Sequence, residues 1–248
     1  MRALGLPLCA ALLSLLLPGR AHATSRKAEP VRVREARRLR EAEVRAWFKS
    51  AGVAWPAKAL LLRAFKLDDQ LELWAGDDRA APLTLVHTFA ICARSGGPGP
   101  KRKAGDGQVP EGFYTVSQLN PASNFHLSLR VSYPNRADRL RSAARDLGGD
   151  IFIHGDCVTI GCLPLQDGPI EALYLAVLDA KAAGAKTEVH LFPARFDEAG
   201  RKKLAALEEK DPSLASHWRE LSAGYDAFER GHVLPEITID AKGRYVVR

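Results

Sequence analysis

Apolar residues recur along the chain with two different periods, and each period predicts a different kind of element. Short apolar runs bounded by Gly, Pro, Asn or Asp are typical of strands. They occupy residues 59–66, 70–74, 83–92, 113–119, 125–133, 150–154 and 187–192. Helical patterns cover residues 31–50, 197–210 and 213–230, and residues 236–247 predict a closing hairpin.

A further helix follows the turn residues Asp167-Gly168-Pro169. Its apolar positions are spaced to form one buried stripe, and Gly184 marks its end; they are Ile170, Leu173, Tyr174, Val177 and Leu178. Residues 95–112, SGGPGPKRKAGDGQVPEG, are dense in Gly and Pro and predict a long loop. The strands follow one another in series, with some helices inserted among them and others appended after them. This order predicts a mainly β, α+β fold rather than a parallel α/β sheet.

The first 23 residues have the organisation of a secretory signal peptide. Arg2 precedes an apolar run from Leu4 to Leu17, and Ala21-His22-Ala23 forms a small-x-small cleavage signal. The alternative is an uncleaved single anchor. We divide the chain into a signal peptide (1–23), a charged helical segment (24–54) and a large C-terminal domain (55–248). No later stretch has enough consecutive apolar residues to span a bilayer, which predicts an exported protein without stable membrane insertion.

Charge and size narrow the function further. The full chain carries 36 Lys and Arg against 29 Asp and Glu, and loss of the two arginines in residues 1–23 lowers its formal net charge from +7 to +5. Such a charge suits an anionic polymer such as a cell wall, and it is also ordinary for solubility. No nucleic-acid recognition module is present in the sequence, so we expect no nucleic-acid partner.

Three cysteines remain after residue 23, and two of them stand near a histidine in GGDIFIHGDCVTIGCLPLQDG, residues 148–168. His154, Cys157 and Cys162 could bind zinc with Cys92 or His87, but the paired knuckles of structural zinc sites are missing from the sequence. A disulfide could join Cys157 to Cys162, or Cys92 to Cys157, and the second pairing leaves Cys162 as the odd thiol. The third interpretation is a nucleophile with its base.

The nucleophile interpretation explains most of the local chemistry. Only a thiolate attacks a carbonyl readily, so a catalytic cysteine needs a neighbouring base such as His154. A tight turn from Thr159 leads to Cys162, and Gly161 leaves room for a tetrahedral oxyanion to meet the backbone N–H groups of Gly161 and Cys162. We therefore predict Cys162 as nucleophile and His154 as general base and acid.

The segment IHGDCVTIGC resembles the active-site signature of the L,D-transpeptidase catalytic (YkuD) family, in which a His-Gly pair precedes a Ser/Thr-x-Gly-Cys turn. It is most similar to the YafK-like subgroup, where the two halves lie close together. The resemblance extends from about residue 55 to 248, through FKLDDQLELW, GPGPKRKAGDGQVPEGFY, FHLSLRVSYPNRADR, GGDIFIHG, VHLFPARF and GYDAFE…LPEITID. Two departures stand out: Ile160 occupies a common histidine position, and Leu163-Pro164-Leu165 replaces an Arg-containing segment.

The resemblance implies a sandwich-like or barrel-like β domain with inserted and C-terminal helices. It implies that the cysteine attacks a peptide bond at meso-diaminopimelate in peptidoglycan stem peptides, in the periplasm or cell envelope, without cofactor or metal. The acyl-enzyme then passes to an amine, or to water in an amidase of the same fold. A non-catalytic wall-binding domain is the alternative from another class. Arg195 is an additional candidate for binding a substrate carboxylate.

Overall fold

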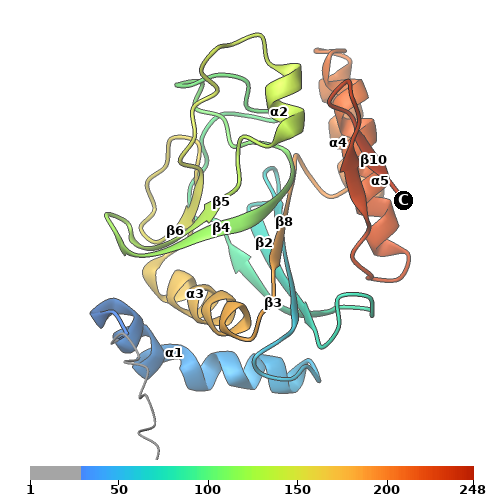
Figure 1. Ribbon diagram of the computed structural model, residues 1–248. Helices are drawn as coiled ribbons and strands as arrows, with labels where there is room; N and C mark the ends of the chain where they lie inside the picture. The colour runs from blue at the N-terminus through green and yellow to red at the C-terminus, as the bar shows by residue number, and fades with distance from the viewer. Residues whose placement is uncertain (1–28) are drawn as a thin grey trace, which may run out of the picture.

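Residues 29–248 are described by the computed structural model (Figure 1). The predicted signal peptide, with Cys9, lies outside these residues. The elements follow one another as α1 (Val31–Ser50), β1 (Ala59–Phe65), β2 (Gln70–Gly76), β3 (Thr84–Ala90), β4 (Gly112–Ser123), β5 (His126–Val131), α2 (Arg136–Arg141), β6 (Phe152–His154), β7 (Leu163–Pro164), α3 (Asp167–Ala182), β8 (Thr187–Phe192), α4 (Glu198–Glu208), α5 (Leu214–Glu229), β9 (Ile237–Ile239) and β10 (Tyr245–Val247). The predicted mixture of strands with inserted and C-terminal helices is confirmed.

Eight strands form one curled sheet in the order β3-β2-β1-β8-β4-β5-β6-β7, and β9 and β10 form a separate hairpin. Most neighbours are antiparallel, but β1 pairs in parallel with β8 and β6 pairs in parallel with β7. Strand β8 therefore joins the N-terminal meander β1–β3 to the β4–β7 half of the sheet. The predicted catalytic histidine and cysteine come from the β6–β7 edge.

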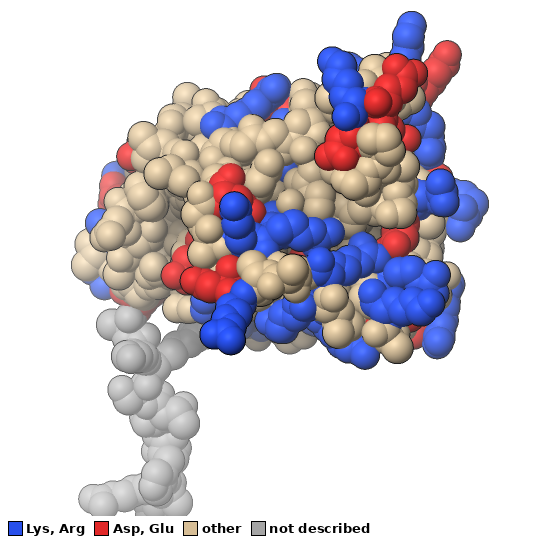
Figure 2. All heavy atoms as spheres, turned by 90° about the horizontal axis from the view of Figure 1, so that it is seen from above, with Lys and Arg blue, Asp and Glu red and all other residues tan. Residues whose placement is uncertain are grey.

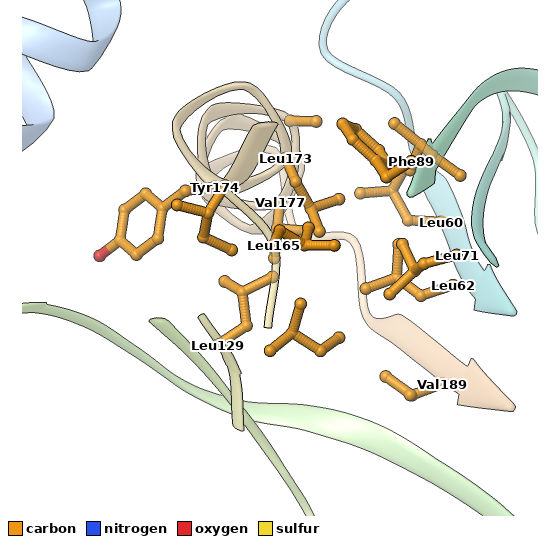
Figure 3. Close-up of a cluster of buried hydrophobic side chains, with 14 of the residues drawn as sticks. Leu60, Leu62, Leu71, Phe89, Leu129, Leu165, Leu173, Tyr174, Val177 and Val189 are labelled. Atoms are coloured by element: carbon orange, nitrogen blue, oxygen red, sulfur yellow. The ribbon is translucent and has the colours of Figure 1, made fainter. Parts of the chain in front are cut away.

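Helix α3 fills the concavity of the curled sheet. Its Leu173 and Val177 point toward side chains of β1, β2 and β8, while Leu165 and Leu129 close the same cluster from the β5–β7 side (Figure 3). Most of the helix is buried, as expected for an element with apolar residues around much of its circumference. This packing fixes the short strand β7, which leads directly into α3.

Helix α1 packs across α3 and β3 and belongs to the same hydrophobic core (Figure 1). Val33, Ala36, Val44 and Phe48 are buried, and the indole of Trp47 stacks on the His87 imidazole of β3 with ring centroids 3.8 Å apart. The charged helical segment is thus an integral layer of the domain, and its other face carries the charges that the sequence emphasises.

Helices α4 and α5 and the β9–β10 hairpin cover the opposite side of the sheet around a second core cluster that includes Phe192, Trp218 and Tyr225 (Figure 1). The face viewed in Figure 2 carries many Lys and Arg side chains, in keeping with the basic composition. Within residues 29–248, no helix is long and apolar enough to cross a membrane.

Two elements are absent from the sequence predictions. Helix α2 is a short segment begun by a capping box, in which Asn135 and Asp138 exchange side-chain-to-backbone hydrogen bonds. Strand β7 is two residues long and contains Pro164. Neither element has enough residues to show a hydrophobic period in the sequence. Local capping begins α2, and pairing with β6 forms β7.

Candidate active site

Cys92 and Cys157 are joined by a disulfide, with a Cα–Cα distance of 5.6 Å, and Cys162 is the free cysteine among residues 29–248. The bridge ties the chain just after β3 to the turn between His154 and Cys162. Of the cysteine arrangements that the sequence leaves open, this is the one that the structure adopts. In the part of the chain that is described, no three His, Cys, Asp or Glu side chains gather as a metal site.

The turn that carries Cys162 is held by two hydroxyl groups. The Cys162 N–H donates to Thr159 Oγ1 (2.9 Å), and that hydroxyl donates back to the Cys162 carbonyl (2.9 Å). The Gly161 N–H donates to Ser95 Oγ (2.9 Å), which belongs to the Gly-rich loop, residues 95–112. Both predicted oxyanion donors are therefore already bonded, and a substrate oxygen would have to displace a hydroxyl.

Gly161 has the conformation and the contacts that require a glycine. Its φ is +96°, and a Cβ at this position would lie 3.0 Å from the Gln108 carbonyl oxygen of the Gly-rich loop. The turn and the loop thus approach each other closely, next to the nucleophile. Ile160, in the position of the family histidine, is 85% exposed, so a side chain at this position points to solvent.

Cys162 opens into a cleft with a volume of about 210 Å³. Its walls come from the ends of β1 and β3 and from the Gly-rich loop, and its charged lining residues are Lys66, Asp69 and Arg94. Arg94 forms an ion pair with Asp69 and donates to the Leu67 carbonyl (3.1 Å), while about half of its side chain stays exposed. An accessible cation and an accessible anion therefore face the same cleft as the thiol.

The Gly-rich loop is braced internally rather than merely solvated. Asp106 accepts hydrogen bonds from Lys101 Nζ and from the backbone N–H groups of Arg102, Lys103 and Gln108. Partial burial by itself would raise the pKa of the Asp106 carboxyl. The four donors together outweigh burial and lower this pKa to about 2. The loop thus forms a fixed wall of the cleft.

A buried carboxylate connects the same loop to the C-terminal helices. Glu111 accepts from Gly99 N–H (2.7 Å), Lys66 Nζ (3.1 Å) and Trp218 Nε1 (2.8 Å). Lys66 also donates to the carbonyls of Gly99 and Val109 at 2.9 Å each. With three acceptors, the Lys66 ammonium is committed to the loop, which leaves Arg94 as the more available cation of the cleft.

Burial raises the pKa of the Cys162 thiol. The Phe152 backbone N–H and the Lys101 charge act in the opposite direction, while Asp150 reinforces the rise. The Cys162 Sγ lies 3.5 Å from the Asp150 carbonyl oxygen, to which it donates. The raised pKa favours the thiol form of Cys162 over the thiolate at neutral pH.

His154 ends β6 and is almost completely buried. Its Nδ1 lies 2.5 Å from the Gly155 carbonyl oxygen, so Nδ1 carries the proton and Nε2 is left as the acceptor. Burial lowers the pKa of the imidazole, against smaller opposing effects of the Gly155 carbonyl and Asp156. A neutral imidazole with a free Nε2 is the form that a general base requires.

His154 is the last residue of β6 and Cys162 immediately precedes β7, and these two strands pair in parallel with Ile153 opposite Leu163 and His154 opposite Pro164. Among the hydrogen bonds of residues 29–248, none joins His154 to Cys162, and Sγ is bonded to Asp150 instead. Catalytic hydrogen bonds are often formed only in the substrate complex. The base and nucleophile roles therefore stay predictions.

Arg195 lies elsewhere. Its guanidinium forms an ion pair with Glu72 (2.6 Å), donates to Gln70 Oε1 (2.7 Å) and covers the Phe65 ring at 4.2 Å. It is not among the residues that line the Cys162 cleft. Glu72, Gln70 and the Phe65 ring thus hold the Arg195 guanidinium, and the accessible guanidinium at the cleft belongs to Arg94, which the sequence did not single out.

The comparison with known proteins identifies the family. The chain is 33% identical over 189 residues to the Escherichia coli (strain K12) protein named "Putative L,D-transpeptidase YafK", a match that covers 75% of this chain and 72% of the relative. This chain belongs to the L,D-transpeptidase (YkuD) family, in its YafK-like subgroup. The family member of E. coli O157:H7 with the same name matches to the same extent.

Two solved structures are similar at lower identity. The helical cell shape determining protein Pgp2 from Campylobacter jejuni has a TM-score of 0.46 and 17% identity, over 79% of this chain and 80% of that one. Mycobacterium tuberculosis L,D-transpeptidase 1 has a TM-score of 0.29 and 12% identity, over 54% and 62% of the two chains. A scan against protein-family models finds no match.

The family assigns the fold to a known class. At the Cys162 cleft, the structure adds side chains that the sequence analysis did not identify. Ser95, Asp69 and Arg94 reach the cleft from segments far from residues 148–168. Ser95 and Arg94 flank the start of the Gly-rich loop, and this adjacency is the signal that could have pointed to them. Asp69 follows β1 in a turn, where an aspartate is ordinary, so nothing in its local sequence marks it.

Proposed function

We propose that the protein is an exported cysteine acyltransferase of the cell wall that acts on peptidoglycan stem peptides at meso-diaminopimelate. The observation that carries this proposal is the free Cys162 thiol, which lines a cleft beside a glycine turn in a chain of the L,D-transpeptidase family. The signal peptide in residues 1–23 supports action in the periplasm or envelope.

The chemistry divides into acylation and transfer. Cys162 Sγ attacks the peptide carbonyl carbon while its proton passes to His154 Nε2. The tetrahedral oxyanion takes the place of the Ser95 hydroxyl at the Gly161 N–H, and the C–N bond then breaks as His154 returns the proton to the departing amine. A thioester remains, and a second amine attacks it to form the new amide and release the thiol.

The depressed pKa of His154 and the raised pKa of Cys162 favour the neutral pair at rest. Proton transfer must therefore accompany attack, so the thiol does not depend on a preformed thiolate. The same acyl-enzyme releases its acyl group to water if no amine occupies the acceptor side, and the enzyme is then an amidase. The two outcomes differ only in the final nucleophile.

Incubation with purified muropeptides followed by mass spectrometry tests the proposal. Joined stems indicate transpeptidation and shortened stems indicate hydrolysis. Cys162→Ala should abolish both products and covalent labelling by a carbapenem, whereas the matched Cys92→Ala/Cys157→Ala protein should keep much of each. Equal labelling of the two variants would contradict Cys162 as nucleophile, and a folded wild-type protein that forms no product would indicate a wall-binding domain.

A further inference from the structure

The turn between β4 and β5, residues 123–126, lies directly against His154. The Phe125 ring is 4.7 Å from the imidazole, centroid to centroid. The Gly155 N–H donates to the Phe125 and Leu127 carbonyls at 3.1 and 3.2 Å, and the Gly155 carbonyl accepts from His154 Nδ1. The 123–126 turn therefore sets both the solvent access of the imidazole and the place of the carbonyl that orients it.

Helix α1 holds this turn directly. Arg32 Nη1 donates to the Ser123 carbonyl (2.6 Å) and to the His126 carbonyl (2.7 Å), so one guanidinium spans the turn. His126 has φ +64°, a left-handed conformation that is uncommon for a residue with a side chain. Contacts from outside the turn compensate such a conformation, and Arg32 supplies two of them.

A second connection runs through α3. His126 Nε2 contacts Glu171 Oε1 at 3.0 Å, and Glu171 Oε2 accepts from Arg40 Nε of α1 at 3.0 Å. Glu171 is buried, and Arg37 fixes α1 to α3 through Asp179 at 2.8 Å. The apolar side of α1 is embedded in the core. The helix is thus a rigid support from which Arg32 contacts the turn directly and Arg40 contacts it through Glu171.

We propose that α1 positions the candidate base: Arg32 and Arg40 hold the 123–126 turn, and that turn orients the His154 imidazole and shields it from water. In assigning His154 a proton to transfer, the inference rests on the proposed function. The contacts of Arg32 and Arg40 that hold the turn, which form a clamp, do not rest on the proposed function, because their effect on the imidazole can be measured without turnover. Arg32 and Arg40 act through other residues and are positioning residues.

The charges around His154 determine how the clamp should be tested. Asp156 is a carboxylate whose charge acts on the imidazole, Asp167 holds the Asp156 N–H at 3.0 Å, and Cys162 immediately precedes the adjoining strand β7. His126, Glu171, Arg32 and Arg40 lie on the clamp side. Burial is the main cause of the lowered imidazole pKa, so a loosened turn that admits water should raise that pKa.

The experiment is an NMR titration of the His154 ring proton in the full-length protein, assigned with His154→Gln. Arg32→Gln should raise the His154 pKa toward its ordinary value. Arg32→Lys keeps the charge, but its side chain ends one bond short of the Nη1 position that contacts both carbonyls, so it should raise the pKa as well. Arg38→Gln is the matched control, because Arg38 lies exposed on the same helix and pairs with Glu35.

Turnover supplies a second readout. On diaminopimelate-containing stems, both Arg32 variants should move the acid limb of the kcat profile to higher pH and lower kcat several-fold, with KM little changed. An unchanged His154 pKa in both Arg32 variants, or an equal shift in Arg38→Gln, would overturn the clamp. If the His154 pKa shifts in Arg32→Gln but not in Arg32→Lys, the shift is a charge effect, and this result would also overturn the clamp. An inactive wild type would defeat the proposed function while leaving the titration decisive.

Discussion

At the scale of residues, the site combines a thiol whose pKa is raised with an imidazole whose pKa is lowered, and both shifts have burial as their main cause. A preformed thiolate–imidazolium pair needs the opposite shifts. These shifts disfavour a resting ion pair, so the proposed mechanism uses general-base activation during attack. This distinction is measurable in the free protein.

Alkylation of Cys162 by iodoacetamide should follow a pH midpoint above that of a free cysteine, about 8.5. The buried thiol disfavours its charged form, and Sγ is bonded to the Asp150 carbonyl rather than to His154. His154→Gln should leave the midpoint unchanged. A midpoint below neutrality that depends on His154 would instead indicate a resting ion pair. Mass spectrometry of the labelled peptide reports the rate.

Arg94→Gln should raise KM for diaminopimelate-containing stems by about tenfold, the effect expected when a charged partner of about 1.5 kcal/mol is lost. Arg94 is the exposed cation of the cleft, next to Asp69, and suits the carboxylate of a zwitterionic substrate end. Arg79→Gln is the control, since Arg79 is equally exposed and pairs with Glu188 away from this cleft. Equal KM values in the two variants would remove Arg94 from substrate binding.

At the scale of elements, the catalytic turn is fixed from three directions. The Cys92–Cys157 bridge ties it to the end of β3, the Ser95–Gly161 bond ties it to the Gly-rich loop, and β7 leads it into α3. The loop is itself braced by Asp106 and Glu111. Cys162, the candidate nucleophile, is therefore held in place by tertiary contacts, because the two-residue strand β7 has little stability of its own.

Cys92→Ala/Cys157→Ala should lower the free energy of unfolding by about 2–4 kcal/mol. The bridge closes a segment with a sequence separation of 65, and cross-links of that length restrict the unfolded chain strongly. Urea unfolding measures the change, and dithiothreitol should lower the wild type to the level of the variant. If reductant and substitution both leave the unfolding midpoint unchanged, the bridge contributes no stability.

At the scale of the whole molecule, the curled sheet separates the core around α3 from the apolar clusters beside α5. Buried histidines lie in the half covered by α5 and the C-terminal hairpin. Burial is the main cause that lowers the pKa of His190 and of His217 to about 3 each, with nearby arginines adding to the effect. Between pH 6.5 and 3 the unfolded chain binds protons that the folded protein does not. Stability from these groups is present above pH 6.5 and is lost as pH falls through this window.

His190→Leu should make stability less dependent on pH. Between pH 7 and 5, the wild type should lose about 2 kcal/mol more free energy of unfolding than the variant, the value for one histidine that protonates only when unfolded. The comparison between the two slopes removes any constant loss from the substitution itself. Parallel pH dependences would show that His190 titrates normally in the folded protein.

Much of the fold was predictable from residue order. The helix over residues 31–50 and the strand over 187–192 match the structure, and the strand predicted over 59–66 ends one residue earlier, because each has a clear period or a long apolar run. The candidate nucleophile and base were predictable because their chemistry is concentrated in residues 148–168. Helix α2, Ser95, Asp69 and Arg94 were missed because their roles come from capping or from contacts between distant segments.

The sequence by itself determined the class of fold, the family signature and the candidate residues for the chemistry, since these depend on local patterning and short motifs. Tertiary structure alone decided which cysteine is free, which cation faces the thiol, and how α1 meets the turn beside His154. It also placed Arg195 against Glu72 and the Phe65 ring. These properties depend on distances between segments that are far apart in the chain, and only the packed sheet and helices fix those distances.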